Sequence, residues 1–284
     1  ARGWMKARGG LDKGRYTKKH TPYRFLASFF LKTEWLLCNF VKYYLEYTVM
    51  QPTTNLNTFA RRAGLLYLLL VPLGFYGLMY VQAFLLVAND VSATLVNIQA
   101  NEMHYRLSIF AALLIQVIQL FIAIQLFQLF RSVDRMWALL IVLFTLVAMP
   151  IAMLNELSRI AILHLLNNGQ ATALWSPQQI PQVVDFLLKL NADGVMIAHI
   201  FWGLWLLPMG VLILKSRLLP SFIGWLMVLA FAGYIADTLL WMLVPTATYE
   251  VAVYTFWGEI IFPLWLVFKG VNTKLSEKIA GTRV

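Results

Sequence analysis

The sequence predicts an all-α, polytopic membrane protein: a bundle of six transmembrane helices with both termini on the cytoplasmic side. Three observations lead to this prediction: the composition, six long apolar stretches, and the distribution of Lys and Arg between them. Hydrophobic residues make up 60% of the 284 residues and only 13% are charged, about half the usual share in a soluble domain. A single Cys and 16 Gly argue against a disulfide scaffold or collagen. The lipid bilayer is therefore the expected surrounding.

Six apolar stretches have the length that a bilayer requires. The hydrocarbon core is about 30 Å thick, which an α-helix of about 20 residues crosses. The stretches are residues 64–87, 107–129, 137–162, 190–214, 219–244 and 250–269. Short polar turns separate them, such as residues 131–135 and 215–217. The expected transmembrane domain covers residues 50–270.

The basic residues predict the orientation of the helices, because loops rich in Lys and Arg remain cytoplasmic. With the amino end inside, the outer loops carry only Arg106 and Lys189. The inner segments carry Arg61, Arg62, Arg131, Arg135, Lys215, Arg217, Lys269, Lys274, Lys278 and Arg283. Residues 271–284 are then a cytoplasmic C-terminal tail.

Residues 1–49 form a basic N-terminal extension with ten Lys and Arg against three acidic residues. Basic residues beside a bilayer are attracted to anionic headgroups, so we expect a membrane surface rather than a nucleic acid as the partner. Two interpretations remain open: an interfacial amphipathic helix, or sequence upstream of a native start at Met50. The lone Cys38 lies in this extension.

The longest outer loop, residues 163–189, contains Pro177 and Pro181. Proline is common at the first position of a helix, so a short helix is expected to follow. An interfacial connector is preferred, and a lid is the alternative.

Ionisable residues inside a bilayer are costly and usually face the bundle interior. Counting from the span ends at about 1.5 Å per residue places most of them in the outer third of the membrane, with the histidine and the last glutamate nearer the midplane. These candidate ligand-binding residues are Glu156, Arg159, Asp193, His199, Asp237 and Glu259. They predict one polar cavity that opens outward. Alternatively, Glu156 and Arg159 neutralise each other and clamp helices together.

Two weaker features belong to the same region. Pro263 cannot bond to the carbonyl of Glu259, so the last span is expected to kink there and to free an oxygen beside a carboxylate. Gln116 and Gln119 lie on nearly one helix face, where packing between helices is the simpler explanation.

Enzyme motifs are scarce, so whether the protein is an enzyme stays open. The sequence contains no HExxH, GxSxG, P-loop or Rossmann pattern, and its four histidines have no paired spacing. We therefore expect no metal and no cofactor.

Several runs of the sequence carry a family resemblance. The runs are ARRAGLLYLLLVPLGFYGLMYV, LNELSRIAIL, GEIIFPLWLVFKGV and the long run from Ala198 through Leu240. They resemble the bacterial integral membrane proteins of domain-of-unknown-function family 4386, over residues 60–270. The resemblance implies a multi-pass protein of the bacterial cytoplasmic membrane and brings no activity or site.

Three functional classes remain open from the sequence. The cavity would bind or transport a small polar ligand, as a carrier or sensor does. Alternatively, the protein is an intramembrane enzyme acting on lipid or prenyl substrates with Glu259 or His199 as a general base, or a non-catalytic assembly or stress protein whose charges are fully paired.

Overall fold

The structure is a computed structural model that describes residue 39 and residues 56–167, 175–176, 178–244 and 250–272. The chain divides into two units, residues 1–52 and 53–284, and nearly all described residues belong to the second. The predicted extension, except for Asn39, and the tail from residue 273 onward lie outside the described residues.

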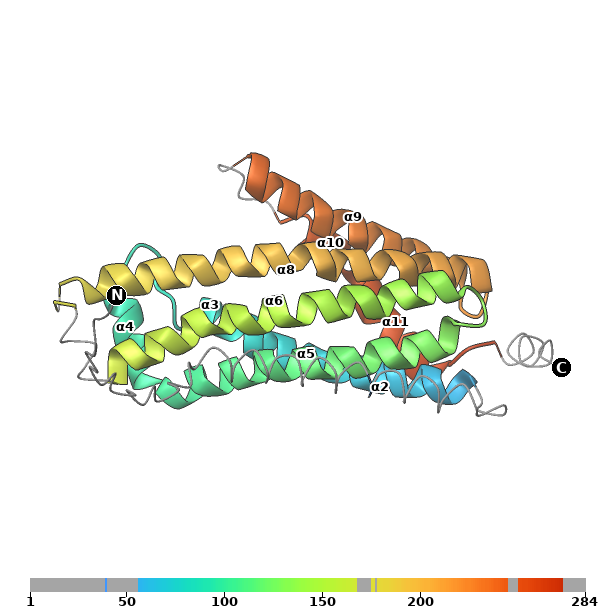
Figure 1. The fold of residues 1–284 in the computed structure, drawn as a ribbon, viewed down its shortest axis with the longest axis horizontal. Helices are drawn as coiled ribbons and strands as arrows, with labels where there is room; N and C mark the ends of the chain where they lie inside the picture. The colour runs from blue at the N-terminus through green and yellow to red at the C-terminus, as the bar shows by residue number, and fades with distance from the viewer. Residues whose placement is uncertain (1–38, 40–55, 168–174, 177, 245–249, 273–284) are drawn as a thin grey trace, which may run out of the picture. The chain divides into compact units, whose positions relative to one another are not determined.

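Every element assigned in the described part of the second unit is a helix (Figure 1). In chain order these are α2 (Leu56–Gly74), the π-helix η1 (Phe75–Met79), α3 (Tyr80–Phe84), α4 (Val91–Ala100), α5 (Glu102–Phe130), α6 (Arg135–Asn167), α8 (Ile180–Ser216), α9 (Ser221–Leu243), α10 (Ala252–Thr255) and α11 (Trp257–Phe268). The all-helical prediction is confirmed in this part of the chain.

The helices contact one another in an order that closes a ring. Helix α5 lies between α2 and α6, α8 lies between α6 and α9, and α11 contacts both α9 and α2. The long helices α5, α6 and α8 run side by side in Figure 1. Helix α5 is the most enclosed, since every residue from Ile122 to Phe130 is buried.

Five helical segments are long and apolar enough to cross a membrane: Leu56–Phe84, α5, α6, α8 and α9. A multi-pass membrane architecture is therefore supported. The sixth predicted stretch forms α10 and α11, an apolar segment of 10–17 residues that is interrupted at Phe256. This segment, Ala252–Phe268, is shorter than the other five, so the count of six spans stays a prediction. The orientation of the termini also stays a prediction.

The segment after Pro181 does not form a separate connector helix. It is the start of α8, which runs without interruption from Ile180 to Ser216 with proline in its first turn. Proline fits there because the first backbone N–H groups of a helix have no partner within it.

One glycine contact explains how α11 lies so close to α9. A Cβ atom on Gly258 would lie 2.8 Å from the backbone carbonyl carbon of Leu226 and 2.9 Å from its oxygen. Backbone atoms cannot rotate away as a side chain can. Small residues are typical of such helix contacts in membranes, where close packing replaces the hydrophobic effect.

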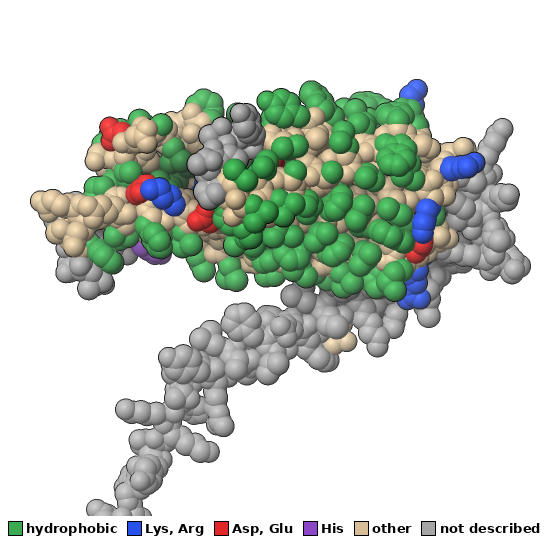
Figure 2. Space-filling model, turned by 90° about the horizontal axis from the view of Figure 1, so that it is seen from above, with side chains coloured by type: hydrophobic (Ala, Val, Ile, Leu, Met, Phe, Trp, Pro, Cys, Tyr) green, Lys and Arg blue, Asp and Glu red, His purple; other side chains and the backbone are tan. Residues whose placement is uncertain are grey.

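Basic residues gather at one end of the bundle, where α2, α6 and α9 begin and α5, α8 and α11 end (Figures 1 and 2). At this end Lys215 donates a hydrogen bond to Asp134 (Nζ–Oδ2, 2.8 Å). Asp134 also accepts from the backbone N–H groups of Met136 and Trp137 in the first turn of α6. The hydrogen bond from Lys215 and these N–H groups lower the pKa of Asp134 below 3.8.

Replacing Asp134 by Asn should lower thermal stability at neutral pH but not at acid pH. Asn still caps α6, so the change removes chiefly the charge. Because the folded-state pKa is lowered, the stabilisation is fully present above the ordinary value of 3.8 and is lost as pH falls through the folded value. Thermal unfolding of wild type and D134N in detergent, from pH 7 to pH 3, tests this. A stability difference that persists unchanged at pH 3 would contradict it.

Replacing Gly258 by Ala should destabilise the protein by about 1–3 kcal/mol, because α11 must move away from Leu226. Gly74 provides a matched control, since a Cβ atom there meets no atom within 4 Å. Gly74→Ala should be neutral or stabilise by up to about 1 kcal/mol. Thermal unfolding in detergent compares the two variants, and equal midpoints would show that the contact at Gly258 is not tight.

Candidate functional site

The side chains of Glu156 and Arg159 form a buried ion pair, and each residue is 4% exposed. Nη1 of Arg159 lies 3.0 Å from Oε2 of Glu156 and also donates to the carbonyl oxygen of Gly77 at 3.0 Å. Nη2 donates to the hydroxyl of Ser108, and the guanidinium lies 5.3 Å from the ring centroid of Tyr105. The arginine therefore joins α6 to α5 and to η1.

Gly77 reaches Arg159 because the backbone of η1 lies against α5. A Cβ atom on Gly77 would lie 2.7 Å from the backbone nitrogen of Ala112. Single π-helical turns occur often at functional positions. Here the turn supplies a carbonyl oxygen to a buried cation.

Asp237 is held by backbone rather than by a cation. It is 4% exposed, and its carboxylate accepts hydrogen bonds from the N–H groups of Val251 (2.5 Å) and Ala252 (2.9 Å). These are the groups at the start of α10 that have no partner within that helix. Asp237 thus fixes the position of α10 against α9.

Glu259 lies in the first turn of α11 and is bonded by tyrosines. The hydroxyl of Tyr67 donates to its Oε2 at 3.0 Å, and Tyr234 is a second hydrogen-bond partner of the carboxylate. The ring of Tyr67 stacks on Trp205 with centroids 5.8 Å apart. Pro263 lies inside α11, so the carbonyl of Glu259 receives no N–H from the residue four positions on.

His199 on α8 lies beside one of these tyrosines. Its ring lies 5.1 Å from that of Tyr234 and 5.4 Å from that of Trp202, measured between centroids. Its Nδ1 atom is buried and has no hydrogen-bond partner among the described residues. Tyr234 therefore connects His199 to Glu259.

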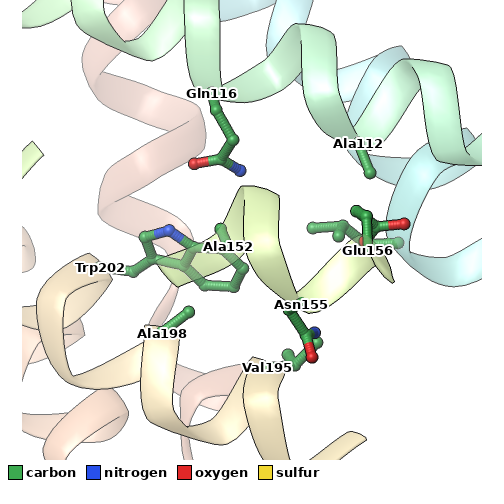
Figure 3. Close-up of a pocket in the computed structure, with 9 residues that line it drawn as sticks. Ala112, Gln116, Ala152, Asn155, Glu156, Val195, Ala198 and Trp202 are labelled. Atoms are coloured by element: carbon green, nitrogen blue, oxygen red, sulfur yellow. The ribbon is translucent and has the colours of Figure 1, made fainter. Parts of the chain in front are cut away.

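A cavity of about 10 Å³ lies between α5, α6 and α8 (Figure 3). Two groups at its wall, Oε1 of Gln116 and Nε1 of Trp202, are buried without a partner among the described residues. In Figure 3 both groups point into the space between α5 and α8. The lining residues are Leu78, Ala112, Gln116, Ala152, Asn155, Glu156, Val195, Ala198 and Trp202.

Two asparagines join α6 to α8 beside this cavity. Nδ2 of Asn155 donates to the carbonyl of Asn191 at 2.9 Å, and Nδ2 of Asn191 donates to the carbonyl of Asn155 at 3.2 Å. Gly194 permits this approach, since a Cβ atom there would overlap the amide oxygen of Asn155 at 2.0 Å. The reciprocal pair fixes the distance between the two helices.

The structure brings the six predicted residues together only in part. Glu156 pairs with Arg159, while His199 and Glu259 are connected through Tyr234. The carboxylate of Asp237 accepts hydrogen bonds from the backbone at the start of α10. Asp193 is exposed on the surface of α8. Ligand binding by these residues stays a prediction.

Several partners of the ionisable residues were not predicted from the sequence. Arg159 contacts Ser108 and Gly77, and Glu259 contacts Tyr67 and Tyr234. Trp202 lines the cavity. The one contact that the sequence predicted is between Glu156 and Arg159, because residues three apart lie on the same face of a helix. Among the described residues, no three His, Cys, Asp or Glu side chains are grouped as metal ligands would be.

The apolar helices and the enclosed polar groups define a multi-pass helical membrane protein. The chain belongs to the family described as "Domain of unknown function (DUF4386)", which matches residues 62–270 and confirms the resemblance. An uncharacterized protein of Archaeoglobus fulgidus is 40% identical over 84 residues, which are 30% of this chain and 49% of that relative. The match thus spans about half of a relative that is archaeal. No solved structure matches the chain.

Replacing Arg159 by Met should destabilise the protein by about 3–5 kcal/mol, because Glu156 is left buried without its cation. The double variant Glu156→Gln with Arg159→Met should recover part of this loss. The exposed pair Arg106–Glu102 is the control, and Arg106→Met should cost less than about 1 kcal/mol. Denaturation in detergent measures all four proteins. Equal losses for R159M and R106M would show that the buried pair is not a structural requirement.

Proposed function

We propose that the protein is a six-span protein of the cytoplasmic membrane, with both termini inside, that binds a small polar or cationic solute as a carrier or sensor does. The position of the basic residues supports the orientation, since Arg61, Arg131, Arg135, Lys215 and Lys269 all lie at helix ends on one side of the bundle. The ring of contacts in which α11 joins α9 to α2 supports the count of six.

The observation that carries the proposal is the environment of Glu259. Three carboxylates with partners inside the bundle differ in what they bond to: Glu156 has an arginine and Asp237 has two backbone N–H groups. Glu259 has only tyrosine hydroxyls among the interactions of the described residues. A hydroxyl both donates and accepts, so it is able to bond to a solute while it holds the carboxylate.

Two further polar atoms belong to Glu259 itself or to a residue in contact with its partner Tyr234. The backbone carbonyl of Glu259 is freed by Pro263, and Nδ1 of His199 beyond Tyr234 has no partner among the described residues. Carbonyls freed within membrane helices line solute and ion sites in transporters. The group favours a small cation or a solute with N–H or O–H donors.

A second candidate, a non-catalytic assembly role, is favoured by a different observation. Glu156, Arg159 and Asp237 all have partners within the bundle, as they would if their purpose were to hold helices together. Such a protein would show no ligand-dependent stabilisation.

Replacing Glu259 by Gln should abolish stabilisation by the solute. The test heats full-length protein in detergent with a panel of alkali and alkaline-earth cations, small amines and polyols. A solute present at 100 times its dissociation constant should stabilise wild type by about 2.7 kcal/mol. Gln preserves the shape of the side chain but removes the charge and one acceptor.

Asp193→Asn is the matched control, because it removes a carboxylate that is exposed on α8. It should respond to the panel as wild type does. If E259Q and wild type were stabilised equally by the same solute, Glu259 would not be the binding group. If no member of the panel stabilised wild type, the assembly role would be preferred.

A further inference from the structure

We infer that the cavity between α5, α6 and α8 is a binding site for one neutral molecule of the size and hydrogen-bonding capacity of water, held between Gln116 and Trp202. The inference does not depend on the function proposed for the Glu259 group, because Glu259 does not line this cavity. The two residues that hold the molecule come from different helices, Gln116 from α5 and Trp202 from α8.

Two polar groups on the cavity wall are buried without a hydrogen-bond partner among the described residues. Gln116 is 2% exposed, and its Oε1 atom has no partner among the described residues. Nε1 of Trp202 is also buried and also has no hydrogen-bond partner among the described residues. Buried polar groups are paired with protein or with ordered water in the great majority of cases, because leaving them unpaired is unfavourable. Two such groups on one cavity indicate a shared partner.

The second argument is size. A single water needs a cavity of about 10–15 Å³ and two to four polar partners. The cavity has about 10 Å³, and Gln116 and Trp202 provide the two partners. A larger solute does not fit without movement of α6 or α8, which the reciprocal Asn155–Asn191 bonds hold together.

The third argument is hydrogen-bond polarity. The indole N–H of Trp202 only donates, and Oε1 of Gln116 only accepts. The occupant must therefore accept one hydrogen bond and donate another. Metal ions and ammonium cannot accept, and halide ions cannot donate. Water and ammonia do both, which leaves neutral molecules of this kind.

Nuclear magnetic resonance of full-length protein with 15N-labelled indoles, in ammonium-free buffer, tests the site. Trp202→Phe identifies the Trp202 signal by its disappearance. We expect a cross-peak between this indole proton and water. Gln116→Leu should weaken that cross-peak and shift the signal, because the water loses its acceptor. Gln119→Leu is the matched control, since Gln119 is buried on the same helix but does not line the cavity.

Each outcome decides the question. No water cross-peak at Trp202 would overturn the inference, as would a shift in Q116L without a water cross-peak, which indicates a direct bond between the two side chains. Ala152→Val adds bulk to the cavity wall and should remove the cross-peak even if Q116L fails to fold. A cross-peak that persists in A152V places the water elsewhere. A shift on adding ammonium chloride at alkaline pH identifies ammonia as the alternative occupant.

Discussion

Hydrocarbon offers no hydrogen-bond partners, so the polar groups of a membrane bundle must be satisfied by the protein itself. This constraint explains most of the contacts described above. Three carboxylates illustrate three solutions: Glu156 has a cation, Asp237 has backbone N–H groups, and Glu259 has tyrosine hydroxyls. Each solution draws in a different neighbour, so the polar residues determine which helices lie together.

The three solutions also differ in how easily they are exchanged. The guanidinium of Arg159 is bonded to groups on α5, α6 and η1, so moving it breaks several contacts at once. The bonds to Asp237 define the start of α10. A tyrosine hydroxyl, by contrast, changes partner by rotating its O–H bond. This difference is the reason why the proposed solute site is placed at Glu259.

Much of the fold was predictable because composition and apolar length are properties of single segments. Five of the six predicted stretches correspond to long apolar helices. Neither the helix break at Phe256 nor the uninterrupted length of α8 was predicted, because no local sequence pattern indicates them. The site was predictable only in its ionisable members. Tyr67 lies 192 residues from Glu259 in the sequence, and backbone donors such as those at Asp237 leave no sequence signal.

Helix length explains why charge is distributed as it is. The 33 residues of α6 and the 37 of α8 span about 50 and 56 Å, well beyond a core of about 30 Å. Counted from the basic end, Glu156 lies about 32 Å along α6, a distance close to the thickness of a hydrocarbon core. Beyond it, the helix ends far from the basic end pack around their own buried apolar cluster, which includes Val81, Leu85, Ile98, Tyr105, Ile109, Ile162, Leu163 and Val184.

Glu259 lies only about 14 Å from the end of α11, which is about half the thickness of a hydrocarbon core. A charge costs most at the bilayer centre. A carboxylate at half a core thickness therefore depends more on the hydrogen bonds of its tyrosine partners than one near either end of the bundle would.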